Sequence, residues 1–168
     1  MLGATLLCGN TTGGKYYLPI FLLYHVLDKF AAACYKPIMN PRIKNKLTEI
    51  AIANPGTRNR IKMAAGVVYR NRLIAYGING YKTHPLMLNN GYRTDQIFLH
   101  AEVDALRNAM KKIDLKQLSK CEMYIVRVKR PNKNSKSYIS GMAKPCEGCQ
   151  NTIASFGIKK IYYTEDDQ

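Results

Sequence analysis

Two short motifs constrain this chain of 168 residues more than any other feature: His100-Ala101-Glu102 and Pro145-Cys146-Glu147-Gly148-Cys149. A histidine and two cysteines provide the nitrogen and sulfur ligands that Zn²⁺ prefers. Three protein ligands leave one position of a tetrahedral ion open, as in catalytic zinc sites, whereas structural sites usually close all four. We therefore expect His100, Cys146 and Cys149 to hold one catalytic zinc ion, with Glu102 close by and uncoordinated.

Both motifs stand where the sequence predicts the start of a helix. The residues after His100 are good helix formers, and the apolar ones recur at helical spacing: Ala101, Ala105, Leu106 and Ala109. In the second motif, Pro145 suits the first turn of a helix, and Cys146 and Cys149 lie three residues apart on one helical face. A helix N-terminus stabilises thiolates, which lowers their pKa and favours metal binding.

The remaining pattern predicts strands that alternate with helices. We expect a helix over 42–53, strands over 63–69, 72–78, 122–129 and 158–164, a long loop over 80–97, and a helix from Cys146 that ends near Gly157. The long loop leads directly into His100, so we expect it to cover the site. This order predicts a three-layer α/β/α domain with a central mixed sheet of about five strands.

The first 38 residues differ in character from the rest of the chain. They are apolar and aromatic, but their uncharged run, 16–27, has twelve residues, fewer than the roughly 20 that a membrane-spanning helix needs. We therefore expect no transmembrane segment, and a helix here that packs on the core. Met39 precedes Asn40-Pro41 and a clean amphipathic helix, so we predict that 39–168 is the complete catalytic domain and that the extension 1–38 is dispensable.

Charge and cysteine content bear on partners and compartment. Lysine and arginine number 26 against 11 acidic residues, for a formal net charge of +15, which favours phosphorylated or polyanionic partners. Once two of the five cysteines are assigned to metal, Cys8, Cys34 and Cys121 remain, an odd number without the spacing of a disulfide framework. We therefore expect a reducing, cytoplasmic location.

Taken together, the motifs resemble the cytidine deaminase-like superfamily, and within it the CMP/dCMP-type deaminases, whose signature is H-x-E followed by P-C-x-x-C. The resemblance covers roughly residues 58–164. It implies that Glu102 transfers protons between water and the base, and that Asn79, within Gly77-Ile78-Asn79-Gly80, contacts the sugar or the base. We also expect the backbone N–H of Ala101, at a helix start, to orient the base. Family relatives commonly self-associate, which implies a homo-oligomer.

Three hypotheses about the function stay open. The first is a free cytosine nucleotide, with dCMP the best candidate from the resemblance. The second is a base in RNA or single-stranded DNA, because residues 42–72 and 116–144 each carry eight lysines and arginines against a single glutamate. The third is a non-catalytic nucleic-acid-binding module with a structural zinc, which would need His84 or Cys121 as a fourth ligand.

Overall fold

The central feature of the computed structural model is a five-stranded mixed sheet, and the residues that the structure describes are 38–55, 62–82, 84–88 and 98–167. The strands lie in the order β2-β1-β3-β4, with neighbours antiparallel, and β5 pairs in parallel with β3. Their bounds are β1 (Lys62–Tyr69), β2 (Arg72–Ile78), β3 (Glu122–Lys129), β4 (Ile139–Gly141) and β5 (Lys160–Tyr163). The predicted mixed sheet of about five strands is confirmed.

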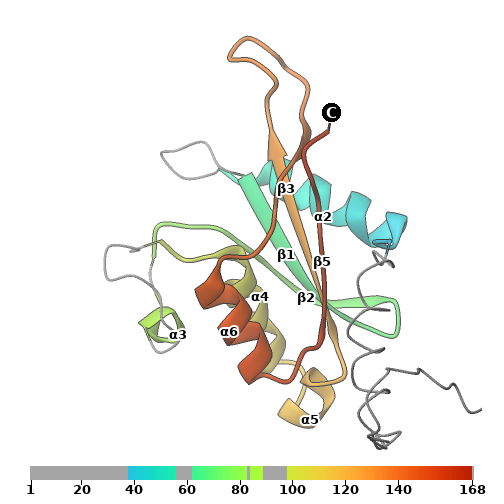
Figure 1. The fold of residues 1–168 in the computed structure, drawn as a ribbon, viewed down its shortest axis with the longest axis vertical. Helices are drawn as coiled ribbons and strands as arrows, with labels where there is room; N and C mark the ends of the chain where they lie inside the picture. The colour runs from blue at the N-terminus through green and yellow to red at the C-terminus, as the bar shows by residue number, and fades with distance from the viewer. Residues whose placement is uncertain (1–37, 56–61, 83, 89–97, 168) are drawn as a thin grey trace, which may run out of the picture. The chain divides into compact units, whose positions relative to one another are not determined.

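Helices cover both faces of this sheet (Figure 1). On one face lies α2 (Pro41–Ala53), and on the other lie α4 (Ala101–Met110) and α6 (Glu147–Ser155). Two one-turn helices, α3 (Pro85–Leu88) and α5 (Leu115–Leu118), complete the described elements. The predicted three-layer α/β/α architecture is therefore confirmed.

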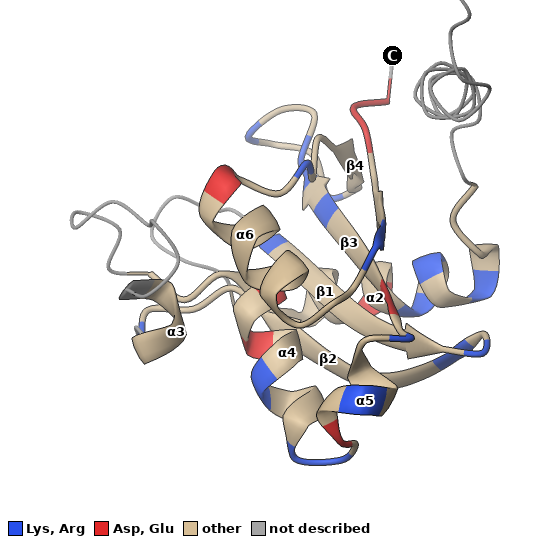
Figure 2. Ribbon diagram, turned by 60° about the horizontal axis from the view of Figure 1, so that its bottom comes forward, with Lys and Arg blue, Asp and Glu red and all other residues tan. Residues whose placement is uncertain are grey.

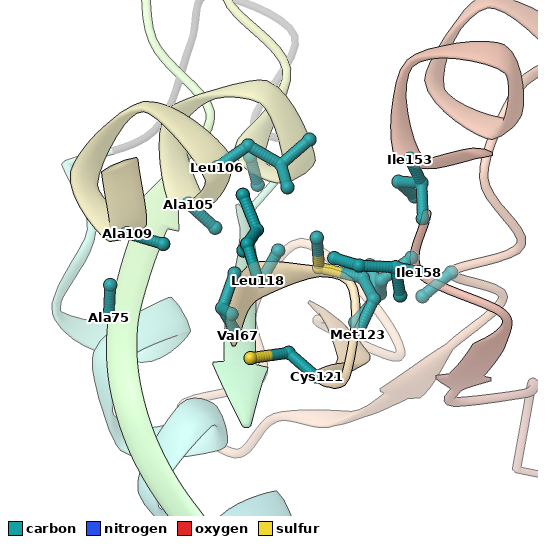
Figure 3. Close-up of a cluster of buried hydrophobic side chains, with 14 residues drawn as sticks. Val67, Ala75, Ala105, Leu106, Ala109, Leu118, Cys121, Met123, Ile153 and Ile158 are labelled. Atoms are coloured by element: carbon teal, nitrogen blue, oxygen red, sulfur yellow. The ribbon is translucent and has the colours of Figure 1, made fainter. Parts of the chain in front are cut away.

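Alternation along the strands gives the sheet one apolar cluster on each face, and a third, smaller cluster (Met87, Leu99, Val103 and Cys149) lies beside the start of α4. Side chains of β1 and β3 that point to α4 and α6 include Val67, Met123 and Ile125, and their neighbours in sequence point to α2. Figure 3 shows the first cluster, in which Leu106 of α4 and Ile153 of α6 lie over this face of the sheet. The two helices that carry the candidate site are thus held by a continuous apolar layer.

Local chemistry explains where the elements begin and turn. The Asn40 side chain caps α2 by accepting a hydrogen bond from the Arg42 N–H at 3.0 Å, with proline as the first helical residue. Arg70 and Asn71 both have positive φ, 47° and 59°, as a two-residue type I′ hairpin turn between β1 and β2 requires. Gly157 ends the α6 segment with φ of 78°, as predicted.

Three details differ from the sequence-based expectation. Pro145 does not lie in the first turn of α6, because Cys146 is the N-cap and the proline precedes it. The 80–97 segment is not loop throughout, since four of its residues form α3. The helix α5 was not predicted; its N-cap Asp114 accepts a hydrogen bond from the Gln117 N–H at 2.7 Å.

Two further expectations concern residues outside the described part of the chain. The predicted packing of 1–37 and the covering of the site by 89–97 both fall there. Among the described residues, no helix has the length and apolar character that crossing a membrane requires.

Candidate metal centre

The fold brings the three predicted ligands together at the ends of two helices. His100 is the N-cap of α4, Cys146 is the N-cap of α6, and Cys149 lies in the first turn of α6. His100 Nδ1 lies 3.2 Å from Cys149 Sγ and 3.5 Å from Cys146 Sγ. One ligand atom from each residue lies within 4.8 Å of the other two. Residues 46 and 49 positions apart in sequence thus meet at one point.

This spacing fits a tetrahedral zinc ion. Zn–N bonds of about 2.0 Å and Zn–S bonds of about 2.3 Å, at tetrahedral angles, place nitrogen and sulfur about 3.5 Å apart. The two observed nitrogen–sulfur distances of 3.2 and 3.5 Å agree with that geometry. Cys149 is buried, whereas Cys146 is exposed, so the cluster lies at the surface end of the helix pair rather than deep in the core.

The electrostatics of the cluster favour the ligand form of the exposed cysteine. Hydrogen bonding from Cys149 and then from His100 lowers the pKa of Cys146 to about 4, against the opposing effect of burial. The same contact with Cys146 raises the pKa of His100. A thiolate at the N-cap of a helix, beside an imidazole, is the charge state in which cysteine binds metal.

Glu102 lies beside the cluster and is buried, with 3% of its surface exposed. Burial raises the pKa of its carboxyl, and the backbone, His100 and Cys149 act in the opposite direction. Among the described residues the metal-ligand group contains only His100, Cys146 and Cys149. The Glu102 carboxyl therefore interacts electrostatically with the cluster but is not one of its three members. A residue that transfers protons must be uncoordinated in this way.

The two residues predicted to contact substrate lie at the same end of the sheet. Asn79 follows β2, and its Oδ1 accepts hydrogen bonds from Asn54 Nδ2 at 2.8 Å and from the Met63 N–H at 2.9 Å. These bonds hold the amide in one orientation. Ala101 is buried as the first residue of α4, next to His100. Their contacts with substrate stay predictions.

The two residues considered as a fourth ligand have other partners. His84 Nδ1 accepts a hydrogen bond from the Leu86 N–H at 3.2 Å. Cys121 lies in the apolar cluster between α4, α5 and the sheet, and its thiol donates to the Gln117 carbonyl (Figure 3). Neither belongs to the metal-ligand group that the described residues form. Glu147, between the two cysteines, is exposed.

Asn54, Asp104, Thr152 and Thr164 are buried polar residues that were not predicted from the sequence. Asn54 fixes Asn79, and Asp104 accepts a hydrogen bond from the Ile78 N–H at 3.1 Å. Thr164 Oγ1 accepts from the Arg127 N–H and donates to the Gly141 carbonyl, which braces the segment leading to Cys146. Asp104 carried a usable signal, because it follows the His-x-Glu motif within one turn of the predicted helix. Asn54 and Thr164 are recognisable only from long-range contacts, and Thr152 donates locally to the Gly148 carbonyl within α6.

A known protein family matches most of this chain. The model of the family "Cytidine and deoxycytidylate deaminase zinc-binding region" matches residues 42–165, and these include every residue of the cluster. The chain belongs to this zinc-binding deaminase family. The fold, the histidine and cysteine cluster and the family together identify Zn²⁺ as its metal.

Individual solved structures match this chain at about a quarter of identical residues. A search of curated proteins finds no match. Among solved structures, dCMP deaminase from the cyanophage S-TIM5 in apo form is 26% identical, with 76% of this chain and 86% of that chain covered and a TM-score of 0.49. The same enzyme in complex with dCMP and dUMP is 25% identical, with 75% and 83% covered and a TM-score of 0.49.

Proposed function

We propose that this protein catalyses the hydrolytic deamination of a cytosine nucleotide, with dCMP and water giving dUMP and ammonia. His100, Cys146 and Cys149 would hold the zinc ion, and Glu102 would move the protons. The observation that carries the proposal is the convergence of those three ligand atoms within 4.8 Å, beside a carboxyl that is 3% exposed.

The reaction replaces the exocyclic amino group of cytosine with oxygen from water. Zinc, when bound, supplies Lewis-acid activation of water at neutral pH. Glu102 accepts the proton that water gives up and delivers protons to the ring nitrogen and to the departing amino group, so that ammonia leaves. Its burial supports this role, because a carboxyl with a raised pKa takes up a proton readily.

Other groups would bind and orient the base. The N–H groups at the start of α4 point out of the helix without an intrahelical partner, and Ala101 contributes one of them next to His100. The amide of Asn79, held by Asn54 and Met63, would contact the sugar or the base. Because the amide and the helix start are already held in place, substrate binding there costs little conformational entropy.

The positions of the basic and aromatic residues bear on the choice between a free nucleotide and a polynucleotide strand as the substrate. Figure 2 shows lysine and arginine on several elements, among them α2, β3, α4 and α5. A strand is usually bound through a continuous basic groove with aromatic side chains open for stacking. Tyr138, which directly precedes β4, already has cationic partners in its own chain, because Lys62 and Arg130 lie 5.6 and 5.3 Å from its ring centre, whereas Tyr76 and Tyr81 are exposed.

The test is ammonia release from a panel of dCMP, CMP, cytidine, deoxycytidine, guanine and single-stranded oligonucleotides. We expect turnover of dCMP, with Glu102→Ala as the inactive control. Turnover of oligonucleotides without turnover of dCMP would instead establish the polynucleotide hypothesis, which the surplus of basic residues motivates. Release from none of them by zinc-loaded protein would overturn the proposal.

A further inference from the structure

Three side chains of α4 and the turn after it are paired with the outer edge of β2. Asp104 accepts a hydrogen bond from the Ile78 N–H at 3.1 Å, Asn108 Nδ2 donates to the Tyr76 carbonyl at 2.9 Å, and Lys112 Nζ donates to the Ile74 carbonyl at 2.8 Å. Every fourth residue from Asp104 onward thus pairs with every second residue of β2, counted back from Ile78. The spacings agree, because four helical residues rise about 6 Å and two strand residues about 6.7 Å.

The strand also approaches the helix backbone unusually closely at Gly77. A Cβ added there would lie 2.2 Å from the Ala105 nitrogen and 2.6 Å from the Ala101 carbonyl oxygen. The end of β2 therefore lies directly against the first turn of α4, which contains Glu102. A shift of the helix along the strand would move the site relative to Asn79.

One of these three pairings connects directly to the site. The Asp104 N–H donates to the His100 carbonyl at 3.1 Å, while its carboxylate holds Ile78, the residue before Asn79. The carboxylate is nearly buried, and Arg107 Nη2 lies 2.7 Å from its other oxygen. Asp104 thus joins the ligand-bearing end of α4 to the strand end that carries the predicted substrate contact.

We propose that Asp104 is a positioning residue for deamination, which sets the distance between the zinc and Glu102 end of α4 and the Asn79 end of β2. The proposal rests on the proposed function for its kinetic consequence. Asn108 and Lys112 lie about one and two turns farther from the site, so they close the strand edge and contribute to stability without setting this distance.

The experiment compares Asp104→Ala with Asn108→Ala, each of which removes one helix–strand pairing. We expect both to lower the thermal midpoint, but only Asp104→Ala to lower kcat on dCMP, by about tenfold or more, as misplacement of reacting groups does. Asp104→Asn keeps an oxygen for the Ile78 N–H and should restore most of the kcat. Zinc release to a chelator, measured without substrate, should be faster for Asp104→Ala than for Asn108→Ala.

Equal kcat and equal zinc release in the two alanine variants would overturn the proposal, and so would failure of Asp104→Asn to restore kcat. If Asp104→Ala does not fold, Asp104→Ser, whose side chain is too short to reach Ile78, replaces it. Absence of dCMP turnover in the unmodified protein would count against the proposed function alone. The zinc-release comparison would then still decide the role of Asp104.

Discussion

At the scale of single residues, side chains of the same type differ in burial and in neighbours, and we therefore expect them to differ in role. Glu102 and Glu147 each lie within a motif that the metal centre uses, but one is buried next to the cluster and the other is exposed. Cys149 and Cys121 are both buried, but of the two only Cys149 belongs to the group with a histidine and a second cysteine. These pairs provide matched tests.

Glu102→Ala should keep zinc and lose turnover. The carboxyl is not a member of the metal-ligand group, and loss of a general acid–base residue typically costs about 10²–10⁴-fold in rate. Zinc content by elemental analysis and kcat by ammonia release measure the two effects. Glu147→Ala is the control and should match the unmodified protein in both. A Glu102→Ala variant that loses zinc but keeps part of its activity would show that Glu102 is a ligand.

Cys149→Ala should abolish stoichiometric zinc binding, because two remaining ligands hold the ion poorly. Cys121→Ala should retain one zinc per chain, since its thiol lies in the apolar cluster and donates to the Gln117 carbonyl. The measurement is zinc per chain after dialysis against a weak chelator. Equal zinc content in the two variants would contradict the assignment.

At the scale of elements, the sequence was informative wherever the determinants are local. The helix start at α2, the hairpin turn between β1 and β2 and the Gly157 terminus depend on neighbours in sequence, and all three were predicted within a few residues. The grouping of His100, Cys146 and Cys149 was predictable because the chemistry and spacing of these residues are specific. The pairings of α4 with β2 and the Asn54–Asn79 contact were not, because they join residues about 25 positions or more apart.

Gly77→Ala should destabilise the fold by roughly 2 kcal/mol or more, as overpacking of a filled site does, because the new methyl would meet backbone atoms that cannot rotate away. Gly80→Ala is the control, since nothing lies within 4 Å of a Cβ built there. Urea unfolding midpoints compare the two. A Gly77→Ala variant as stable as Gly80→Ala would show that β2 does not lie directly on α4.

At the scale of the whole molecule, the site belongs to the compact unit 37–168. The first described helix, α2, packs against β1 and β3 on the face opposite the metal centre. The described residues of the site all lie after Met39. Self-association and the role of 1–38 stay predictions, because their determinants lie outside the described contacts.

A chain that begins at Met39 should fold and deaminate with the kcat/KM of the full chain. The three predicted ligands, the predicted proton-transfer residue Glu102 and the buried members of the three apolar clusters all lie after this position. Expression of the two lengths, followed by thermal melting and ammonia release, makes the comparison. An insoluble or inactive shorter chain would show that the extension is part of the catalytic unit.

X-ray absorption at the zinc edge of the purified protein tests the catalytic metal centre most directly. We expect one zinc coordinated by one imidazole nitrogen and two sulfurs, with a light atom from exchangeable solvent in the fourth position. A shell of three sulfurs, or of two imidazole nitrogens with two sulfurs, would mean a closed structural site and would contradict the assignment of a catalytic zinc.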